Sequence, residues 1–577
     1  MPVRIVQTIF SDVYYPAAAG KGIKALNLGM IILKITGMFS SKKIQFARII
    51  LSIVSAGILF AGSAAAQQRN DPRATVQKFS SMLQLINYYY VDSSDAVRLT
   101  ESAITGMLKE LDPHSVYLSK EEVKKANEPL QGNFEGVGIQ FQLFHDTILV
   151  IAAVPGGPSD KLGIMAGDKI ITIDGEEAYG KKVTNNFVME RLRGPKGTKV
   201  NVGILRKGRN GLIDYVIVRD KIPLNSVDAT FMLDNETGYI KLTRFARTSL
   251  TEVRESIASL RKSGMKNLIL DLRNNSGGFL DIAIDLSDEF LPADRLIVYT
   301  EGLRSPRMEF KATSRGNFEK GRLIVMVNES SASASEIVAG AVQDWDRGLV
   351  IGRRSFGKGL VQRPFTLPDS SVVRLTTARY YTPSGRSIQK PYDAGVEDYF
   401  ADLTNRFRHG EFVSADSIRF PDSIKYFTPS KRVVYGGGGI MPDVFIPLDT
   451  ATSSKYYTDL WRKGLLNEYT INYLDGKREV LLNAYPDVST FRKNFDAGDG
   501  FLNEFVAFAA NGGVPEDADG LERSGREIRY ILKGMIARNL YDVSAYYEVI
   551  SPVDHELMQA FEAIKNDVLF RKLSIAM

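Results

Sequence analysis

Two short apolar runs constrain the fold of this chain more than any other feature. Residues 268–272 (LILDL) and 323–327 (LIVMV) are nearly continuous in apolar side chains, which is typical of strands buried on both faces. Helical patterns at 250–262 and 281–291 alternate with these runs, and a further strand is predicted at 238–242. This alternation of strands and helices predicts an α/β layer.

The rest of the chain shows other residue patterns. At 577 residues, the chain is also too long for one compact core. Apolar positions at helical spacing predict helices over 71–128, interrupted by a turn at 111–115. Short strands with glycine turns predict a small β-rich domain that ends near Pro223. Residues 393–430 are polar and irregular, which favours a long surface excursion, and the chain becomes helical and charged after Pro447.

The predicted fold class is therefore α/β and multidomain. We expect five parts: an upstream extension plus signal peptide (1–66), a helical N-terminal segment (67–131), a β-rich domain (132–222), an α/β core (223–450) and a mainly helical C-terminal domain (451–577).

The charge and the metal-binding residue types exclude several functions. The net charge of +6 arises wholly within residues 1–66, and 66 basic and 66 acidic residues remain after them, so nothing indicates a nucleic-acid partner. There is no cysteine, which rules out disulfides and thiolate chemistry. The four histidines have no metal-site spacing, so no metal site is predicted.

The N-terminus resembles a targeting segment. Lys42, Lys43 and Arg48 precede a short apolar run at 49–61, and small residues before Gln67 form a cleavage site. We expect cleavage after Ala66 and export to a periplasm or cell envelope. Residues 1–37 fit no part of a signal peptide, so translation from Met38 is one hypothesis. The alternative is an uncleaved N-terminal anchor.

The candidate catalytic residues follow the second apolar run. Residues 331–337 (SASASEI) let the backbone turn tightly and present a hydroxyl at a helix start, where the helix dipole and free amides favour a nucleophilic oxygen. Ser333 and Glu336 also fit a simple capping box. A serine needs a base, and the candidate is Lys358, provided that its surroundings keep it neutral. Otherwise Lys358 is a solvated loop lysine.

These residues resemble the carboxyl-terminal processing peptidases, also called tail-specific proteases, over about residues 75–450. The match lies in 327–336 (VNESSASASE), 339–344 (AGAVQD) and 356–362 (FGKGLVQ). The resemblance implies a ClpP/crotonase-like protease core that needs no cofactor or metal. It also implies four catalytic residues: Ser333 as nucleophile, Lys358 as general base, Gln362 as the residue that orients the lysine, and Asp344 as a supporting polar residue.

Residues 271–278 (DLRNNSGG) resemble the family's glycine turn, which supplies the oxyanion hole. The resemblance assigns one donor to Gly277 or Gly278 and the other to Ala334, although Ser276 stands where many members carry proline. The rival is a chymotrypsin-like PDZ protease with Ser276 as nucleophile and a histidine as base. Its PDZ domain would follow the catalytic serine, whereas here the β-rich domain comes first.

The β-rich domain resembles a PDZ domain, in which a peptide adds a strand to the sheet edge. Arg193 resembles a residue that links this domain to the active site in some relatives. The alternative is a structural β domain with an ordinary glycine turn. The residues that resemble the carboxylate-binding loop are Gly136, Val137, Gly138 and Ile139.

The sequence as a whole predicts an exported serine endopeptidase that captures C-terminal tails. The expected partners are proteins or peptides with accessible C-terminal tails, and an adaptor or activator and proximity to a membrane are compatible with this function. The alternative class is a non-catalytic peptide-binding scaffold on the same fold.

Overall fold

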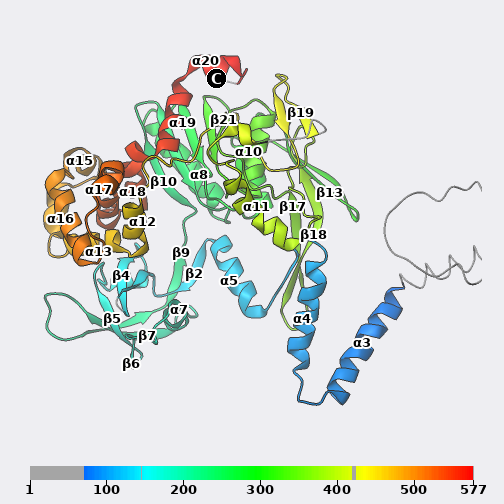
Figure 1. Cartoon of the computed structure of the whole chain (residues 1–577), viewed down its shortest axis with the longest axis horizontal. Coiled ribbons are helices and arrows are strands. Elements are labelled where there is room, and N and C mark those ends of the chain that lie inside the picture. The colour runs from blue at the N-terminus through cyan, green and yellow to red at the C-terminus, as the bar shows by residue number, and fades with distance from the viewer. Residues whose placement is uncertain (1–70, 145, 419–423, 576–577) are drawn as a thin grey trace, which may run out of the picture. The chain divides into compact units, whose positions relative to one another are not determined.

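The structure, a computed structural model, describes residues 71–144, 146–418 and 424–575 (Figure 1). The predicted signal peptide and its cleavage site lie outside the described residues. The chain divides into two compact units, Met1–Thr100 and Glu101–Met577. In the first unit, helix α3 (Pro72–Tyr89) begins at Asp71, whose side chain accepts from the Arg73 amide, and none of its residues is buried.

The predicted helical region contains three helices. Helix α4 (Ala96–Lys109) ends before the predicted turn, and α5 (Lys120–Gln131) begins with a capping box between Ser119 and Glu122. Between them lies a strand that the sequence pattern did not predict, β1 (Val116–Leu118), which pairs with β18 (Val372–Tyr381); both strands belong to the second unit.

The β-rich domain is built on one antiparallel sheet with the strand order β3-β4-β5-β7-β8. Strand β3 lies at an edge of this sheet and pairs only with β4, so its other edge has no partner strand among the described residues, while its Gln140 and Gln142 side chains accept from Arg538 and Asn467. The elements are β2 (Asn133–Gly136), β3 (Ile139–Phe144), β4 (Thr147–Ala153), α6 (Pro158–Lys161), β5 (Lys169–Ile173), β6 (Glu176–Glu177), α7 (Asn185–Leu192), β7 (Lys199–Leu205), β8 (Ile213–Val218) and β9 (Asp220–Pro223).

The core is a six-stranded sheet with the order β10-β11-β12-β15-β16-β21, in which only the β10–β11 pair is antiparallel. The two apolar runs are its central strands β12 and β15, as predicted. The strands are β10 (Val227–Met232), β11 (Thr237–Leu242), β12 (Asn267–Asp271), β15 (Leu323–Val327), β16 (Leu349–Gly352) and β21 (Val444–Phe445). The fold is thus α/β and multidomain, as expected.

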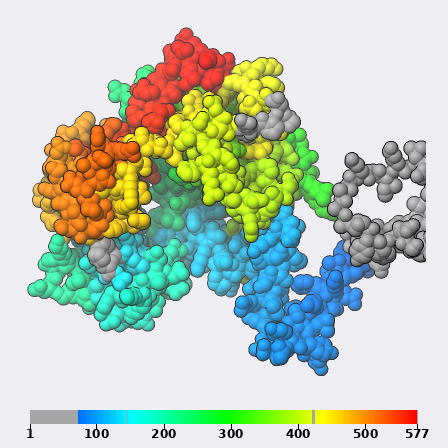
Figure 2. Space-filling view, in the orientation of Figure 1, coloured from blue at the N-terminus to red at the C-terminus, as the bar shows by residue number. Residues whose placement is uncertain are grey.

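Both faces of this sheet are buried, which explains the apolar runs. Leu268 and Leu270 face helices α8 (Ser249–Lys262), α9 (Leu280–Asp288) and α10 (Ala334–Asp344). Ile269 and Met326 face the opposite way, toward α19 (His555–Lys565) and α20 (Asp567–Lys572) at the C-terminus. Figure 2 shows this C-terminal segment in red above the core. The last helices therefore complete the core rather than extend from it.

A second sheet lies beside the core and carries the β17–β18 hairpin. Its other strands are β1, β13 and β14, of which β1 and β13 pair with β18. The region predicted as an irregular excursion contains a helix, α11, with Tyr399 buried on its inner side. The remaining elements are β13 (Leu296–Gly302), β14 (Ser305–Lys311), β17 (Leu360–Thr366), α11 (Val396–Arg408), η1 (Ala415–Ser417), β19 (Lys425–Phe427) and β20 (Val433–Tyr435).

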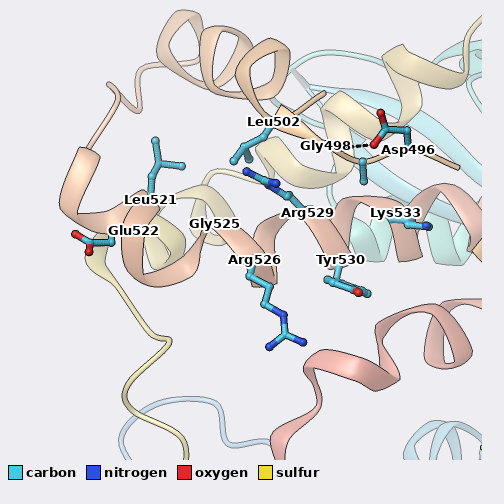
Figure 3. A pocket seen from close by; sticks show the side chains of 11 residues that line it. Asp496, Gly498, Leu502, Leu521, Glu522, Gly525, Arg526, Arg529, Tyr530 and Lys533 are labelled. Atoms are coloured by element: carbon cyan, nitrogen blue, oxygen red, sulfur yellow. Dashed lines mark hydrogen bonds between the residues drawn. The ribbon is translucent and has the colours of Figure 1, made fainter. Parts of the chain in front are cut away.

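The C-terminal region also contains a helical domain with its own aromatic core, centred on Tyr469, Phe495 and Phe505. A pocket of about 550 Å³ opens between 496–502 and one side of α17, where Arg529 lies beside Leu502 (Figure 3). Over the described ranges, no helix is long and apolar enough to span a membrane. The helices are α12 (Lys455–Arg462), α13 (Leu465–Leu474), α14 (Arg478–Ala484), α15 (Val488–Asn494), α16 (Asp499–Asn511), α17 (Ala518–Leu540), α18 (Val543–Ile550) and η3 (Ser551–Val553).

Candidate active site

Ser333 lies at the turn between β15 and α10, immediately before the helix begins. Its φ of 55° lies in the left-handed region, which is strained for a residue with a side chain and is common at functional turns. The side chain is half-buried, whereas α10 itself is wholly buried. The serine hydroxyl is thus held by a tight turn at the positive end of a buried helix.

Glu336 and Tyr380 tie the serine to the lysine loop. The Glu336 carboxylate accepts from the amides of Ser333 (2.8 Å) and Lys358 (2.9 Å), and also from the Ser355 hydroxyl (2.5 Å). The Tyr380 hydroxyl lies within hydrogen-bonding distance of two carbonyl oxygens, those of Ser333 (3.1 Å) and Lys358 (2.5 Å). In the sequence, Glu336 fits only a capping role, and no pattern marks Tyr380.

Lys358 follows a glycine turn and precedes β17, on which Gln362 lies. Its ammonium or amine Nζ donates to Gln362 Oε1 at 3.2 Å, as expected for a residue that orients the lysine. The Ser333 hydroxyl and Lys358 Nζ share no hydrogen bond in the part of the chain that the structure describes. Contacts of this kind are often long in ligand-free sites and shorten when substrate binds.

The environment favours a neutral lysine. Burial lowers the pKa of Lys358, and the neighbouring Arg374 lowers it further, while Glu336 and Asp112 oppose both. Burial also raises the pKa of Glu336 to about 7, against the hydrogen bonds that favour its charged form. Lys358 is therefore a better proton acceptor near neutral pH than an exposed lysine.

The glycine turn lies directly against the serine. A Cβ on Gly277 would lie 2.9 Å from Ser333 Cβ and 3.0 Å from the Ala334 nitrogen. The Gly277 amide donates to Asn275 Oδ1 at 2.9 Å. The amides of Gly278 and Ala334, in contrast, have no acceptor among the described residues. Of the two glycines left open by the sequence, Gly278 has the free donor, and with Ala334 it can hold an oxyanion.

Asp344, for which the resemblance implies a supporting role, does not touch Ser333 or Lys358. It lies at the far end of α10, about 16 Å along the helix from Ser333 at 1.5 Å per residue. Its carboxylate accepts from Arg386 at 2.7 Å and from the Ser384 amide at 2.9 Å. Asp344 therefore stabilises the loop after β18 rather than the reacting groups.

The rival serine lacks a base. Ser276 is exposed on the turn, and no hydrogen bond joins it to a histidine within the described ranges. His114 lies near Lys358 instead, and its ring pairs with the Tyr399 hydroxyl at 2.8 Å. Burial and the nearby Lys358 lower the pKa of His114 to about 4. The geometry favours Ser333 over Ser276.

The predicted carboxylate-binding loop joins β2 to the edge strand β3. The backbone amides of Val137 and Gly138 have no acceptor among the described residues, and Gly138 has a φ of 75°. Ile139 lies half-buried at the start of β3, beside the core of the β-rich domain. Arg193, at the end of α7, pairs with Gly136 as an isolated bridge and forms an ion pair with Glu128 of α5.

No group of three or more histidine, aspartate or glutamate side chains in the described ranges could hold a metal ion. The cluster of Ser333, Lys358 and Gln362 with two free amides is suited to acyl transfer through a serine.

Four sequence families match the chain. Peptidase family S41 matches residues 236–398, and the PDZ domain family matches residues 136–215. The activating protease CtpB N-terminal domain matches residues 53–122. A family of unknown function, DUF8443, matches residues 456–542, which lie in the helical domain.

Two relatives are similar to more than half of the chain. The carboxy-terminal-processing protease of Bartonella bacilliformis is 36% identical over 336 residues, which are 58% of this chain and 76% of that protein. The carboxy-terminal processing protease CtpA of Bacillus subtilis is 36% identical over 54% of this chain and 66% of its own length. Among solved structures, a photosystem II D1 C-terminal processing protease is 25% identical, with a TM-score of 0.33 over 64% of this chain and 92% of its own.

Proposed function

Because this chain belongs to the carboxy-terminal processing proteases of peptidase family S41, and is thus a serine-type peptidase with a PDZ domain, we propose that it is an exported endopeptidase that binds C-terminal tails and cuts by a Ser–Lys mechanism. The observation that carries the proposal is the single Glu336 carboxylate that holds the amides of both Ser333 and Lys358. It fixes the backbone of the serine turn and of the lysine loop at one shared oxygen atom.

The steps follow from these groups. Neutral Lys358 takes the proton from the Ser333 hydroxyl as its oxygen attacks the scissile carbonyl carbon. The amides of Gly278 and Ala334 stabilise the oxyanion. Lys358 then gives the proton to the leaving amine, which departs with the new C-terminal fragment and leaves an acyl group on Ser333. A water molecule, deprotonated by Lys358, hydrolyses this ester and regenerates the hydroxyl.

Tail capture is proposed for the PDZ domain. A peptide would add as a strand to the open edge of β3, with its terminal carboxylate at the free amides of Val137 and Gly138. The half-buried Ile139 and Phe141 of β3 and Phe187 of α7 would contact the last apolar side chains of the tail.

The test compares two peptides with the same apolar C-terminal sequence, one with a free carboxylate and one amidated, on the Ser333→Ala protein. Binding is measured by fluorescence anisotropy. We expect the amidated peptide to bind at least ten times more weakly, because the amide loses the charge-assisted bonds to the loop. Equal affinities would overturn tail recognition without affecting the Ser–Lys assignment.

Export is proposed from the basic and apolar segment that ends at Ala66. N-terminal sequencing of protein recovered from a periplasmic fraction tests it. Gln67 at the N-terminus is expected, whereas a chain that remains cytoplasmic or begins far upstream would contradict it.

A further inference from the structure

The turn before β1 lies directly beside the candidate base, although the sequence assigned it no function. This turn, Asp112 to Ser115, comes from the helical N-terminal region, and Gln362 lies 248 residues away from His114 in the sequence. The Gln362 side-chain nitrogen donates to the His114 backbone carbonyl. The other end of the same amide, Oε1, accepts from Lys358.

The His114 carbonyl determines which way the Gln362 amide faces. A glutamine amide has a donor end and an acceptor end. Rotated by half a turn, it would direct its oxygen at the His114 carbonyl, which cannot donate, and its NH₂ group at the Lys358 nitrogen, where it would occupy the lone pair of the neutral amine. With the amide held as observed, Lys358 donates one N–H to Gln362, and its lone pair remains available for the serine proton.

Asp112 holds the turn that presents this carbonyl. Its carboxylate accepts from the amides of His114 (2.8 Å) and Ser115 (2.9 Å) and from the Ser115 hydroxyl (2.5 Å). Asp112 and Ser115 are both buried, and Pro113 between them fixes its own φ. A buried carboxylate with this many donors keeps the turn in one conformation.

The same two side chains attach the turn to the hairpin that carries Gln362. The Thr376 hydroxyl donates to Asp112 at 3.0 Å, and the Thr376 amide donates to the Ser115 hydroxyl at 3.1 Å. Thr376 lies on β18 directly opposite Gln362 of β17. The turn is therefore in register with the glutamine that it orients.

We propose that residues 112–115 are a positioning element of the general base, in which Asp112 fixes the turn and the His114 carbonyl orients the Gln362 amide toward Lys358. This inference rests on the proposed Ser–Lys mechanism. It makes the base a composite of two distant parts of the chain, so that activity requires β1 to remain paired with β18.

A double-mutant cycle of Asp112→Ala and Gln362→Ala tests the proposal, with kcat and KM measured for a peptide that the wild type cleaves. We expect each single variant to lose on the order of 10²-fold in kcat with a smaller change in KM. The kcat of the double variant should be at most about threefold below that of the less active single variant, because both changes remove the same interaction. Losses that multiply would overturn the proposal.

Asp369→Ala is the matched control. Asp369 holds a similar turn at the exposed end of the same hairpin, where its carboxylate accepts from the Ser371 amide (3.0 Å) and hydroxyl (2.6 Å). It should leave kcat unchanged. Thermal unfolding and tail-peptide affinity, measured on every variant, separate a positioning effect from loss of the fold.

The pH dependence of kcat/KM distinguishes a positioning role from a merely structural one, which would leave it unchanged. The charged groups that act on Lys358 are Glu336 from α10, Arg374 from β18 and Asp112 from the turn; Glu336 and Asp112 raise the pKa of the lysine, and Arg374 lowers it. Asp112→Asn keeps one acceptor oxygen, so it should recover part of the rate lost in Asp112→Ala. It also removes the charge, so the acid limb of kcat/KM should move to lower pH.

Two failures are distinguishable. The positioning role alone would be refuted if Asp112→Asn left the acid limb of kcat/KM unmoved and the kcat losses in the cycle multiplied. In that case Ser333→Ala and Lys358→Ala would still be inactive. Cleavage that survives in Lys358→Ala would refute the base itself, and the positioning role with it.

Discussion

The Oε2 atom of Glu336 accepts the backbone amides of both Ser333 and Lys358, at 2.8 and 2.9 Å. The other oxygen of the same carboxylate accepts the Ser355 hydroxyl and the Gly357 amide. Glu336 is fully buried, so these four bonds are shielded from water. One side chain thus fixes the spacing between the turn that carries the serine and the loop that carries the lysine.

Glu336→Gln should lower kcat on the order of 10²-fold. In either orientation the glutamine NH₂ group would face at least one backbone N–H that it cannot accept, those of Ser333 and Lys358 or that of Gly357, so the serine turn or the lysine loop must move. Steady-state kinetics on a cleaved peptide measures the loss. Glu397→Gln is the control, since Glu397 is an exposed acidic residue in the first turn of α11 and should leave kcat unchanged. A fully active Glu336→Gln enzyme would contradict this role.

The pH dependence of kcat/KM should follow the deprotonation of Lys358. Burial lowers the pKa of this lysine, and only its neutral form accepts a proton, so the rate should rise with pH along a limb centred below the ordinary value of 10.5. Lys358→Arg should be inactive at every pH, because a guanidinium group does not lose its proton in this range. An acid limb near pH 6.5 that is retained in Lys358→Arg would indicate a histidine base instead.

Gly277→Ala should abolish cleavage and reduce stability. The new Cβ would lie 2.8 Å from the Ala332 carbonyl oxygen and 2.9 Å from Ser333 Cβ, at a φ of 102°. Gly175→Ala is the control for the φ alone, since Gly175 has a φ of 82° and open space around its Cβ position. Kinetics and thermal unfolding of both variants separate the clash from the backbone strain. Equal effects of the two substitutions on cleavage would show that the close approach to Ser333 is unimportant.

Ile564→Ala should destabilise the protease core although it lies near the C-terminus. Ile564 is fully buried against the second face of the central sheet, and removing its side chain there should cost about 2–4 kcal/mol. Val568→Ala is the matched control, because Val568 is 73% exposed. Urea unfolding measures both changes. If the two variants were equally stable, the C-terminal helices would not be part of the core.

The sequence predicts most of the core because local residue patterns determine its strands and helices. Apolar runs such as 268–272 must be buried on both faces, and alternation with helices leaves few arrangements. What covers the second face could not be predicted, because α19 is an ordinary amphipathic helix separated from the sheet by the whole helical domain. The strand β1 was missed for a similar reason: three residues carry no usable pattern, and only pairing with β18 defines them.

Those parts of the candidate site that depend on residue type could be predicted from the sequence. Those that depend on the three-dimensional positions of backbone groups could not. Ser333 and Lys358 were candidates from residue type and position, the resemblance supplied their roles and Gln362, and the three lie on connected elements. The choice between Gly277 and Gly278 needed the hydrogen bond from Gly277 to Asn275. The partners of Asp344, Arg386 and the Ser384 amide, could not be predicted, because they lie some 40 residues further along the chain. The role inferred for His114 belongs to a backbone carbonyl, which no residue type reveals.

The central claim is that Ser333 attacks with Lys358 as its base. The most direct measurement is cleavage of an unstructured protein with an apolar C-terminal tail by the wild type and by the Ser333→Ala, Lys358→Ala and Ser276→Ala variants, each checked for folding by thermal unfolding. We expect the wild type and Ser276→Ala to cut and the other two variants to be folded and inactive. Cleavage by folded Ser333→Ala would contradict the account, and binding without cleavage by all four would favour a peptide-binding scaffold.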